Sequence, residues 1–286
     1  MLKVFTAGLL WGTIGLFVKP LSGAGLSPVQ ISLLRLFWCS VILLIFSLKK
    51  YGLSVMKLPL KGLIYCVLLG VISYGVFNIS YTQSININGM GTACVLMYTA
   101  PVFTALASRL IYGERITKLK LFALVLNIAG CVLTVTGGHI DSDRISFAGI
   151  IYGVCSGLCY GLAAVFGRLA GEYADSLKVS VNSYIYGLIF MLVIAVKDIN
   201  AMHINGYIMQ VSILYGLIPT AFAYMLYYSG VNEMKSLSLV PVIASIEPVA
   251  AVMLGRYMYG EALGAVNILG AVIVLLSIII MMRSES

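Results

Sequence analysis

Charged residues are scarce in this chain of 286 residues: they make up 10% of it, against about 25% in a typical soluble domain. Hydrophobic residues make up 61%, and the mean hydropathy is +1.04. This composition excludes an ordinary soluble enzyme or binding domain and indicates an integral membrane protein. The segments between the apolar runs are short, so no separate catalytic domain is expected.

Motifs that would assign a soluble chemistry are also missing. The sequence has no G-x-x-x-x-G-K-[ST] stretch, so no ATP-binding loop is expected to drive the protein. It has no C-x-x-C pair, and its six cysteines fall inside apolar runs, which indicates small buried side chains. The stretch HIDSDR at 139–144 holds one of only two histidines. We expect a solvated turn there, with no metal and no other cofactor.

Ten apolar runs are long enough, at about 17–25 residues, to cross a bilayer as helices. They do not alternate every second residue, which excludes a transmembrane β-barrel. The first run lacks a small-residue cleavage site and is interpreted as a retained helix rather than a signal peptide. We therefore expect an all-α integral membrane protein with ten transmembrane helices. The runs cover approximately residues 4–21, 28–48, 60–81, 90–111, 118–136, 147–169, 177–196, 207–230, 236–258 and 264–282.

Positive charge is distributed unevenly over this layout. If the N-terminus is cytoplasmic, thirteen of the eighteen Lys and Arg residues fall on the cytoplasmic side, four fall on the outer side, and Arg35 lies inside the second run. The positive-inside rule then predicts a multi-pass protein of the cytoplasmic (plasma) membrane with both termini in the cytoplasm. Topology thus accounts for the net charge of +8, and no nucleic-acid partner is expected.

The first half of the sequence recurs in the second half. Because five helices is an odd number, the second copy would enter the membrane from the opposite side. The chain is therefore predicted to consist of two inverted repeats, 1–143 and 144–286, as in secondary transporters with a midplane binding site. The matches pair Pro101 with Pro248 and Glu114 with Glu261 at an offset of 147 residues, and Gly8 with Gly157 and Gly12 with Gly161 at an offset of 149.

The Pro-Val and Tyr-Gly-Glu segments of the fourth and ninth runs, the doubled five-helix unit and the arginine in the second run resemble the EamA family of the drug/metabolite transporter superfamily. The resemblance covers the whole chain. It implies a ten-helix secondary transporter in which helices 1–4 and 6–9 surround a central cavity and helices 5 and 10 pack at one side. Family members mostly export amino acids or other small metabolites, and we expect that function here.

Other functions are left open by the sequence. The protein could be an importer or a broad-specificity drug efflux protein, since nothing in the sequence encodes direction. A membrane-embedded lipid enzyme or a scaffold is a more remote alternative, because no convergent nucleophile, base or metal ligands are present. We expect no enzyme, and the expected partners are a small solute, the lipid bilayer and, if transport is coupled to them, protons. The protein is expected to be a monomer or a homodimer.

Two ionisable residues lie deep in apolar runs, where a charge is costly and marks a functional candidate. Arg35 lies seven residues beyond Pro28, and Glu247 lies in the middle of the ninth run, where the first copy has Ala100. Their depths differ by about 5 Å at 1.5 Å per residue. Glu247 could bind a cationic group or a coupling proton while Arg35 binds a carboxylate. Alternatively, the two could form a structural pair, or Arg35 could snorkel outward alone.

Further binding candidates are aromatic or amide residues at matching places in the two halves. A tyrosine hydroxyl in hydrocarbon needs a partner, so we expect several of them to line a cavity, although interface positions are an alternative. These candidates are Trp11, Tyr74, Asn78, Tyr160 and Tyr224.

Three local features have mechanical interpretations. Pro101 and Pro248 would each bend a helix and are candidate hinges. Glu114 and Glu261 each precede a helix, so we expect them to cap the dipole of that following helix. Glycines four residues apart in the first and sixth runs predict close helix packing.

Overall fold

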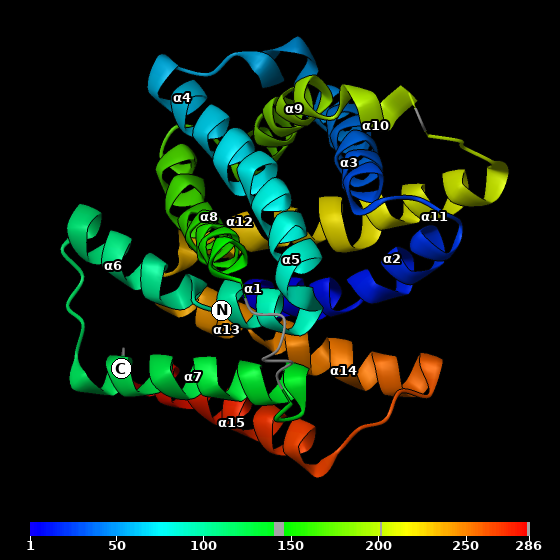
Figure 1. The fold of residues 1–286 in the computed structure, drawn as a ribbon. Helices are drawn as coiled ribbons and strands as arrows, with labels where there is room; N and C mark the ends of the chain where they lie inside the picture. The colour runs from blue at the N-terminus through cyan, green and yellow to red at the C-terminus, as the bar shows by residue number, and fades with distance from the viewer. Residues whose placement is uncertain (140–145, 201, 285–286) are drawn as a thin grey trace.

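The structure is a computed structural model that describes residues 1–139, 146–200 and 202–284. These residues are helical with no β-strand among them, which confirms the all-α prediction. The predicted repeat boundary at 143 and 144 and most of the HIDSDR stretch lie outside the described residues. The helices in Figure 1 are α1 (Leu2–Gly12), α2 (Ile14–Gly23), α3 (Pro28–Tyr51), α4 (Leu60–Leu68), α5 (Phe77–Met97), α6 (Ala100–Tyr112), α7 (Lys118–Thr136), α8 (Phe147–Gly171), α9 (Ser176–Ile194), α10 (Val196–Asn200), α11 (Gly206–Gly216), α12 (Ala223–Glu233), α13 (Leu239–Ala244), α14 (Ile246–Tyr259) and α15 (Ala265–Arg283).

Nine helical stretches of the described chain are long and apolar enough to cross a membrane. They coincide with nine of the predicted runs. The remaining run, predicted at 90–111, is divided between the end of the stretch Leu60–Met97 and α6, which has only 13 residues. The nine stretches are Leu2–Gly23, Pro28–Met56, Leu60–Met97, Lys118–Thr136, Phe147–Gly171, Ser176–Ile194, Gly206–Glu233, Leu239–Tyr259 and Ala265–Arg283.

The stretch Leu60–Met97 turns back on itself at Gly89. The φ of this residue is 80°, in the left-handed region that glycine adopts without a steric penalty. Before the turn, Ser84 donates a hydrogen bond to the carbonyl of Gly149 in α8. After the turn, Leu96 packs against Gly153 of the same helix. The chain therefore runs along α8 twice, in opposite directions.

Three of the long apolar segments are interrupted near their middle. The interruptions lie at Thr13 between α1 and α2, just before α6 at Thr99, and at Ser245 between α13 and α14. In each, the hydroxyl donates a 2.6 Å hydrogen bond to the carbonyl three residues earlier, and the same carbonyl also accepts from the backbone N–H of that Thr or Ser. Pro101 and Pro248 follow two of the interruptions in the first turn of the next helix, where a missing N–H is tolerated.

Glycines hold the interrupted helices in close contact with α1 and α8. A Cβ atom at Gly12 would lie 2.5 Å from the Cβ of Ala250 and 3.0 Å from the carbonyl oxygen of Glu247. In the same way, a Cβ at Gly161 would lie 2.6 Å from the carbonyl oxygen of Ala100. Thus α1 packs on α14 and α8 packs on α6. This confirms the close packing predicted from the glycine spacing.

The helices α7 and α15 form a pair along one edge of the molecule (Figure 1). The pair packs closely because Gly130 faces Val274, where no larger side chain would fit. Asn127 of α7 donates hydrogen bonds to Ser277 of α15 at 2.9 Å and to Ser245 at 2.6 Å. The pair is therefore tied directly to the interruption between α13 and α14.

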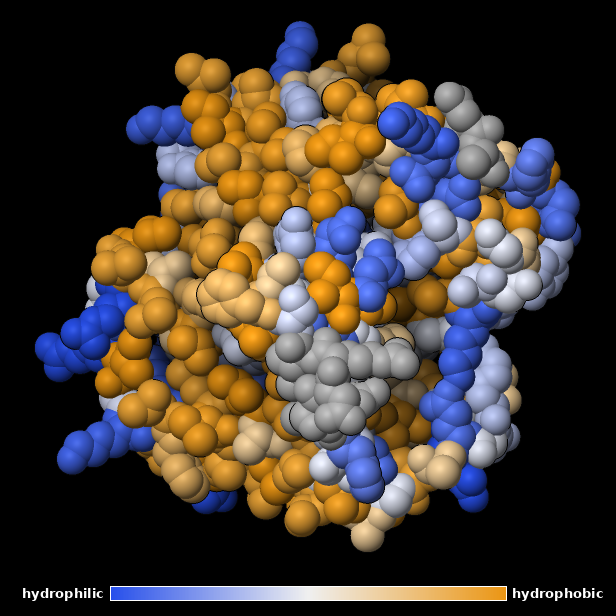
Figure 2. Space-filling view, in the orientation of Figure 1, coloured by the Kyte–Doolittle hydropathy of each residue, from blue (hydrophilic) through white to orange (hydrophobic). Residues whose placement is uncertain are grey.

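Polar groups gather on two opposite faces of the molecule. The first, which we call the terminal face, carries the ion pair of Lys3 with Glu233 and the segment 113–117. The second, the distal face, carries Lys19 and the turn at Gly89. In Figure 2, orange apolar side chains cover most of the surface, and blue side chains lie at its left and right edges, at the top and in a small group near the centre. Such an apolar belt is what the hydrocarbon of a bilayer requires.

Candidate functional site

Glu247 lies in the first turn of α14, directly after the interruption at Ser245. Its side chain is half-buried, and its Oε2 accepts a hydrogen bond of 3.4 Å from the hydroxyl of Tyr160 in α8. The positive end of the α14 dipole favours a carboxylate at this position. Gly12 covers the same turn from α1. The acid is therefore placed where three separate helices meet.

Arg35 lies in α3, beside the middle of the stretch Leu60–Met97. Its Nη2 donates to Oδ1 of Asn78 at 3.3 Å, and its guanidinium carbon lies 5.8 Å from the centre of the Tyr215 ring. The same Asn78 oxygen accepts from Ser32 at 3.0 Å, and the Asn78 amide donates to the carbonyl of Tyr74. Asn78 thus holds the guanidinium in place and connects it to Tyr74.

Glu247 and Arg35 do not form an ion pair. In the described part of the chain, the two ion pairs are Lys3 with Glu233 and Lys19 with Glu261. The structural pair that the sequence left open is therefore not formed, and each charge faces neutral groups instead. An unpaired acid and an unpaired base inside a membrane protein are costly, which is typical of functional sites.

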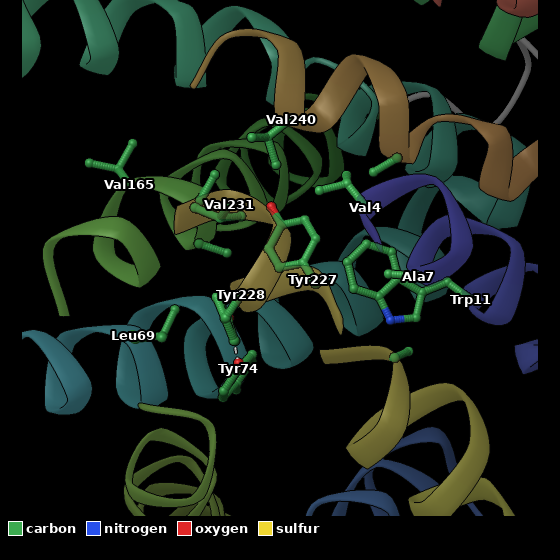
Figure 3. Close-up of a cluster of buried hydrophobic side chains, with 14 of the residues drawn as sticks. Val4, Ala7, Trp11, Leu69, Tyr74, Val165, Tyr227, Tyr228, Val231 and Val240 are labelled. Carbon is green, nitrogen blue, oxygen red and sulfur yellow. Dashed lines mark hydrogen bonds between the residues drawn. The ribbon is translucent and has the colours of Figure 1, made fainter. Parts of the chain in front are cut away.

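A cluster of aromatic side chains connects the acid with the base, and we call it the aromatic core. Its centre is Trp11, whose ring lies 4.8 Å from that of Tyr224, 5.0 Å from Tyr227 and 6.2 Å from Tyr160. Tyr224 lies in turn 5.4 Å from Tyr74. Figure 3 shows the rings of Trp11 and Tyr227 side by side, with Tyr74 nearby. The members are Trp11, Tyr74, Tyr160, Tyr184, Tyr224, Tyr227 and Tyr228.

The aromatic core is closely packed, and most of its polar atoms have partners. The hydroxyls of Tyr74 and Tyr228 bind each other at 2.5 Å, as the dashed line in Figure 3 shows, and both side chains are at most 2% exposed. Two donors at this site are among the buried side-chain donors of the described residues that have no acceptor: the indole Nε1 of Trp11 in the aromatic core and the Nε of Arg35 beside it. A buried donor without a partner costs about 1–3 kcal/mol. An incoming acceptor, such as a carboxylate, would remove that cost.

The structure places all of the predicted binding candidates in this one region. Glu247, Arg35, Trp11, Tyr74, Asn78, Tyr160 and Tyr224 lie in or against the aromatic core. Tyr184 of α9, stacked on Tyr74 at 4.3 Å, was not predicted. A signal for it exists in the sequence, because at the offset of 149 that pairs Gly8 with Gly157, Tyr184 takes the place of Arg35. The predicted hinges, Pro101 and Pro248, adjoin the interruptions rather than the rings.

The predicted role of Glu114 and Glu261 as caps of the following helices is wrong. The N-terminus of α7 is capped by Thr117, whose hydroxyl accepts from the backbone N–H of Lys120. At the N-terminus of α15, the side chain of Asn267 accepts from the backbone of residue 264. Both glutamates instead reach groups of the other half of the chain. Local spacing suggested a partner at the start of the next helix, but the folded chain supplies partners from the other half of the sequence.

Comparison with known proteins gives a consistent assignment. The EamA-like transporter family matches this chain twice, over residues 1–136 and 147–283. An uncharacterized transporter of Archaeoglobus fulgidus is 26% identical over 98% of this chain and 95% of its own length. The inner membrane transporter YedA of Escherichia coli is 25% identical over 75% of this chain and 68% of its own. The threonine/homoserine exporter RhtA of Salmonella typhimurium is 26% identical over 69% of this chain and 64% of its own.

The fold also has a counterpart among solved structures. One crystal structure superimposes with a TM-score of 0.82 over 99% of this chain and 96% of the other, at 17% sequence identity. At that identity the likeness concerns the fold alone. The two family matches together cover nearly the whole chain and agree with its apolar helices. This protein is therefore a multi-pass membrane protein that belongs to the EamA-like transporter family.

Proposed function

We propose that this protein is a secondary active transporter that exports a small metabolite, such as an amino acid, by alternating access. The observation that carries the proposal is the junction of Glu247, Arg35 and the aromatic core. An acid, a base and a set of ring faces meet there beside interrupted helices, where transporters of this kind bind their solutes. The family membership supports a transport function in general, and the junction supports a solute-binding site at this place in the protein.

The proposed architecture is ten transmembrane helices arranged as two inverted repeats, 1–143 and 144–286. The two separate matches to one family model, over 1–136 and 147–283, support a doubled unit. The turn at Gly89 supports a tenth crossing, because residues 90–112 run back along α8 towards the terminal face. Five crossings in each half would place the halves in opposite orientations. The excess of Lys and Arg on the terminal face supports a cytoplasmic position for that face and both termini.

The two charges suit a solute that carries opposite charges itself. A carboxylate at Arg35 would accept from the guanidinium and from the indole of Trp11, both of which have a buried N–H without an acceptor. An ammonium group would face Glu247 and the ring faces of the aromatic core. In the absence of solute, Glu247 would be available to a coupling proton. The relative RhtA, a threonine/homoserine exporter, agrees with this class of solute.

The proposal is tested by flux of solutes in proteoliposomes. Purified protein is reconstituted, and uptake of radiolabelled amino acids, including threonine and homoserine, is measured with and without a pH gradient. We expect saturable flux of at least one solute that the gradient accelerates. Glu247→Gln is expected to abolish the acceleration, whereas Glu172→Gln, at an exposed acid of the terminal face, retains it.

The same assay distinguishes the alternatives. Flux of hydrophobic cations but not of amino acids would favour a drug efflux protein. An importer would be favoured if the pH gradient accelerated flux towards the side of the terminal face more than flux in the other direction. If a thermal unfolding measurement shows that the protein is folded, absence of flux for the whole panel would contradict a transport role at the junction.

A further inference from the structure

A second polar site lies on the terminal face, away from the aromatic core, and joins the two halves of the chain. The carboxylate of Glu114 accepts from the hydroxyl of Ser236 at 2.7 Å, from the backbone N–H of Leu237 at 2.7 Å and from the hydroxyl of Ser238 at 3.3 Å. We call these four residues the clasp. Glu114 follows α6, whereas residues 236–238 form the turn that leads into α13.

The turn residues of the clasp are buried, so the terminal face is closed to water at this position. Ser236 and Ser238 are each 3% exposed, and Leu237 is fully buried. Lys120 of α7 donates a further hydrogen bond to Ser236 at 3.3 Å. Burial alone would raise the pKa of Glu114, but the hydrogen bonds from Leu237 and Ser236 outweigh it and lower the pKa. The carboxylate is thus charged at neutral pH and binds by charge-assisted hydrogen bonds, which are the stronger kind.

Glu261 is the equivalent of Glu114 in the second half, and its local backbone is the same. Gly113 and Gly260, which precede the two glutamates, have φ values of 67° and 66°. The side chain of Glu261 nevertheless has a different kind of partner. It pairs with Lys19, and both side chains are 49% exposed on the distal face. The difference between the two acids therefore comes from their tertiary surroundings.

Residues 89–91 are the equivalent of the turn 236–238 that Glu114 binds. Glu261 does not bind this turn, and the turn is exposed. At the offset of 147 residues, Leu237 corresponds to Met90, next to the turn at Gly89. Met90 is 66% exposed, whereas Leu237 is 0% exposed. The terminal face is thus closed at the position where the distal face is open. An inverted repeat that closes one face at a time requires this asymmetry in each of its two end states.

We propose that Glu114 and Glu261 are the two locks of the transport cycle, and that they engage in turn. In the opposite state, Glu114 releases residues 236–238, and Glu261 leaves Lys19 to accept hydrogen bonds from the backbone of residues 89–91. This proposal rests on the inverted-repeat transporter proposed above. It assigns to the Tyr-Gly-Glu segments a role distinct from the binding of solute.

The two locks differ in strength because their partners differ. The clasp offers two hydroxyls and is supported by Lys120, whereas residues 89 and 91 are glycines and the equivalent of Lys120 is Asn267. Asn267 is already engaged with the carbonyl of Thr134. The distal lock can therefore use backbone N–H groups but no hydroxyls at residues 89 and 91. The state with a closed terminal face is consequently the resting state.

The test measures how accessible each turn is to water. Reporters with one accessible cysteine, Leu237→Cys and Met90→Cys, are made in protein with Cys155→Ala, since the other five native thiols are buried. Labelling rates with a water-soluble maleimide are measured in nanodiscs without solute. We expect fast labelling of the Met90→Cys reporter and slow labelling of the Leu237→Cys reporter.

Loss of the clasp is expected to reverse this pattern. Glu114→Ala should raise the labelling rate at 237 and lower that at 90, each by about tenfold, the shift expected when charge-assisted hydrogen bonds are lost from one of two states. Adding Glu261→Ala should restore fast labelling at 90, because neither face can then lock. Glu172→Ala, at an exposed acid outside the clasp, is the matched control and should leave both rates unchanged.

Three results would overturn the proposal. Unchanged rates in Glu114→Ala would show that the clasp is not a lock. Faster labelling at both positions, at an unchanged melting temperature, would show loosening rather than alternation. A double variant that labels like Glu114→Ala alone would remove Glu261 from the distal lock. Because labelling needs no solute, it is independent of flux. A shift in labelling without flux would leave the locks in place and contradict the transport function alone.

Discussion

The hydroxyl of Tyr160 lies 3.4 Å from Oε2 of Glu247 and joins α8 to the first turn of α14. This contact links the acid to the aromatic core, because Tyr160 also packs against Trp11 at the centre of that core. A change in the protonation or the partner of Glu247 would therefore alter its hydrogen bond with Tyr160. The contact gives the acid its one neutral hydroxyl partner among the hydrogen bonds described above.

Tyr160→Phe removes this hydroxyl and keeps the ring. We expect the initial rate of gradient-driven flux to fall about 3- to 10-fold, the range that corresponds to one hydrogen bond. The melting temperature should change little because the ring contacts remain. Flux in proteoliposomes and thermal unfolding measure the two effects. Tyr152→Phe, at an exposed tyrosine of the same helix, is the control. Equal flux in both variants would argue against a role for Tyr160.

Gly12→Ala should destabilise the contact between α1 and α14. The added Cβ would lie 2.5 Å from the Cβ of Ala250, so the helices must separate. We expect a loss of about 1–3 kcal/mol in the free energy of unfolding, as for other overpacked sites. Gly15→Ala is the matched control, since nothing lies within 4 Å of the Cβ it would add. Thermal unfolding in detergent compares the two variants. Equal melting temperatures would show that α1 is not closely packed at Gly12.

Asn127 and Ser245 should be energetically coupled. Their 2.6 Å hydrogen bond ties α7 to the interruption between α13 and α14. A double-mutant cycle with Asn127→Ala and Ser245→Ala is expected to give a coupling of about 1 kcal/mol in unfolding free energy. The pair Asn127 and Ser156 serves as a control, because Ser156 bonds within α8. Additive effects for both pairs would mean that the contact does not stabilise the interruption.

Trp11 should report solute binding by its fluorescence. The chain has two tryptophans, so Trp38→Phe leaves Trp11 as the only indole. We expect the amino acid that gives the fastest flux to change the emission of this variant saturably, because a carboxylate would reach the indole N–H. Trp11→Phe, which leaves Trp38, should show no such change. A saturable signal from Trp38 alone would place the solute away from the aromatic core.

Several parts of this arrangement could be predicted because they depend on local pattern. The apolar runs specify the membrane-spanning helices, since lipid offers no partner to an exposed backbone group. The glycines at 12 and 161 predicted close packing. Pro101 and Pro248 predicted bends in their helices, and both lie just after an interruption. Arg35 and Glu247 were recognisable as candidates because a charge in an apolar run is costly wherever it points.

The remaining parts depend on contacts between residues far apart in the chain. Tyr184 joins the aromatic core only because α9 packs beside Tyr74, and no pattern within α9 distinguishes that tyrosine from its neighbours. Glu114 and Glu261 have the same sequence context and the same local backbone, yet one is bound in a buried turn and the other in an exposed ion pair. The sequence alone determined the helices and the candidate charges. Only the tertiary structure decided their partners, because a hydrogen bond between the halves forms only after both halves have packed.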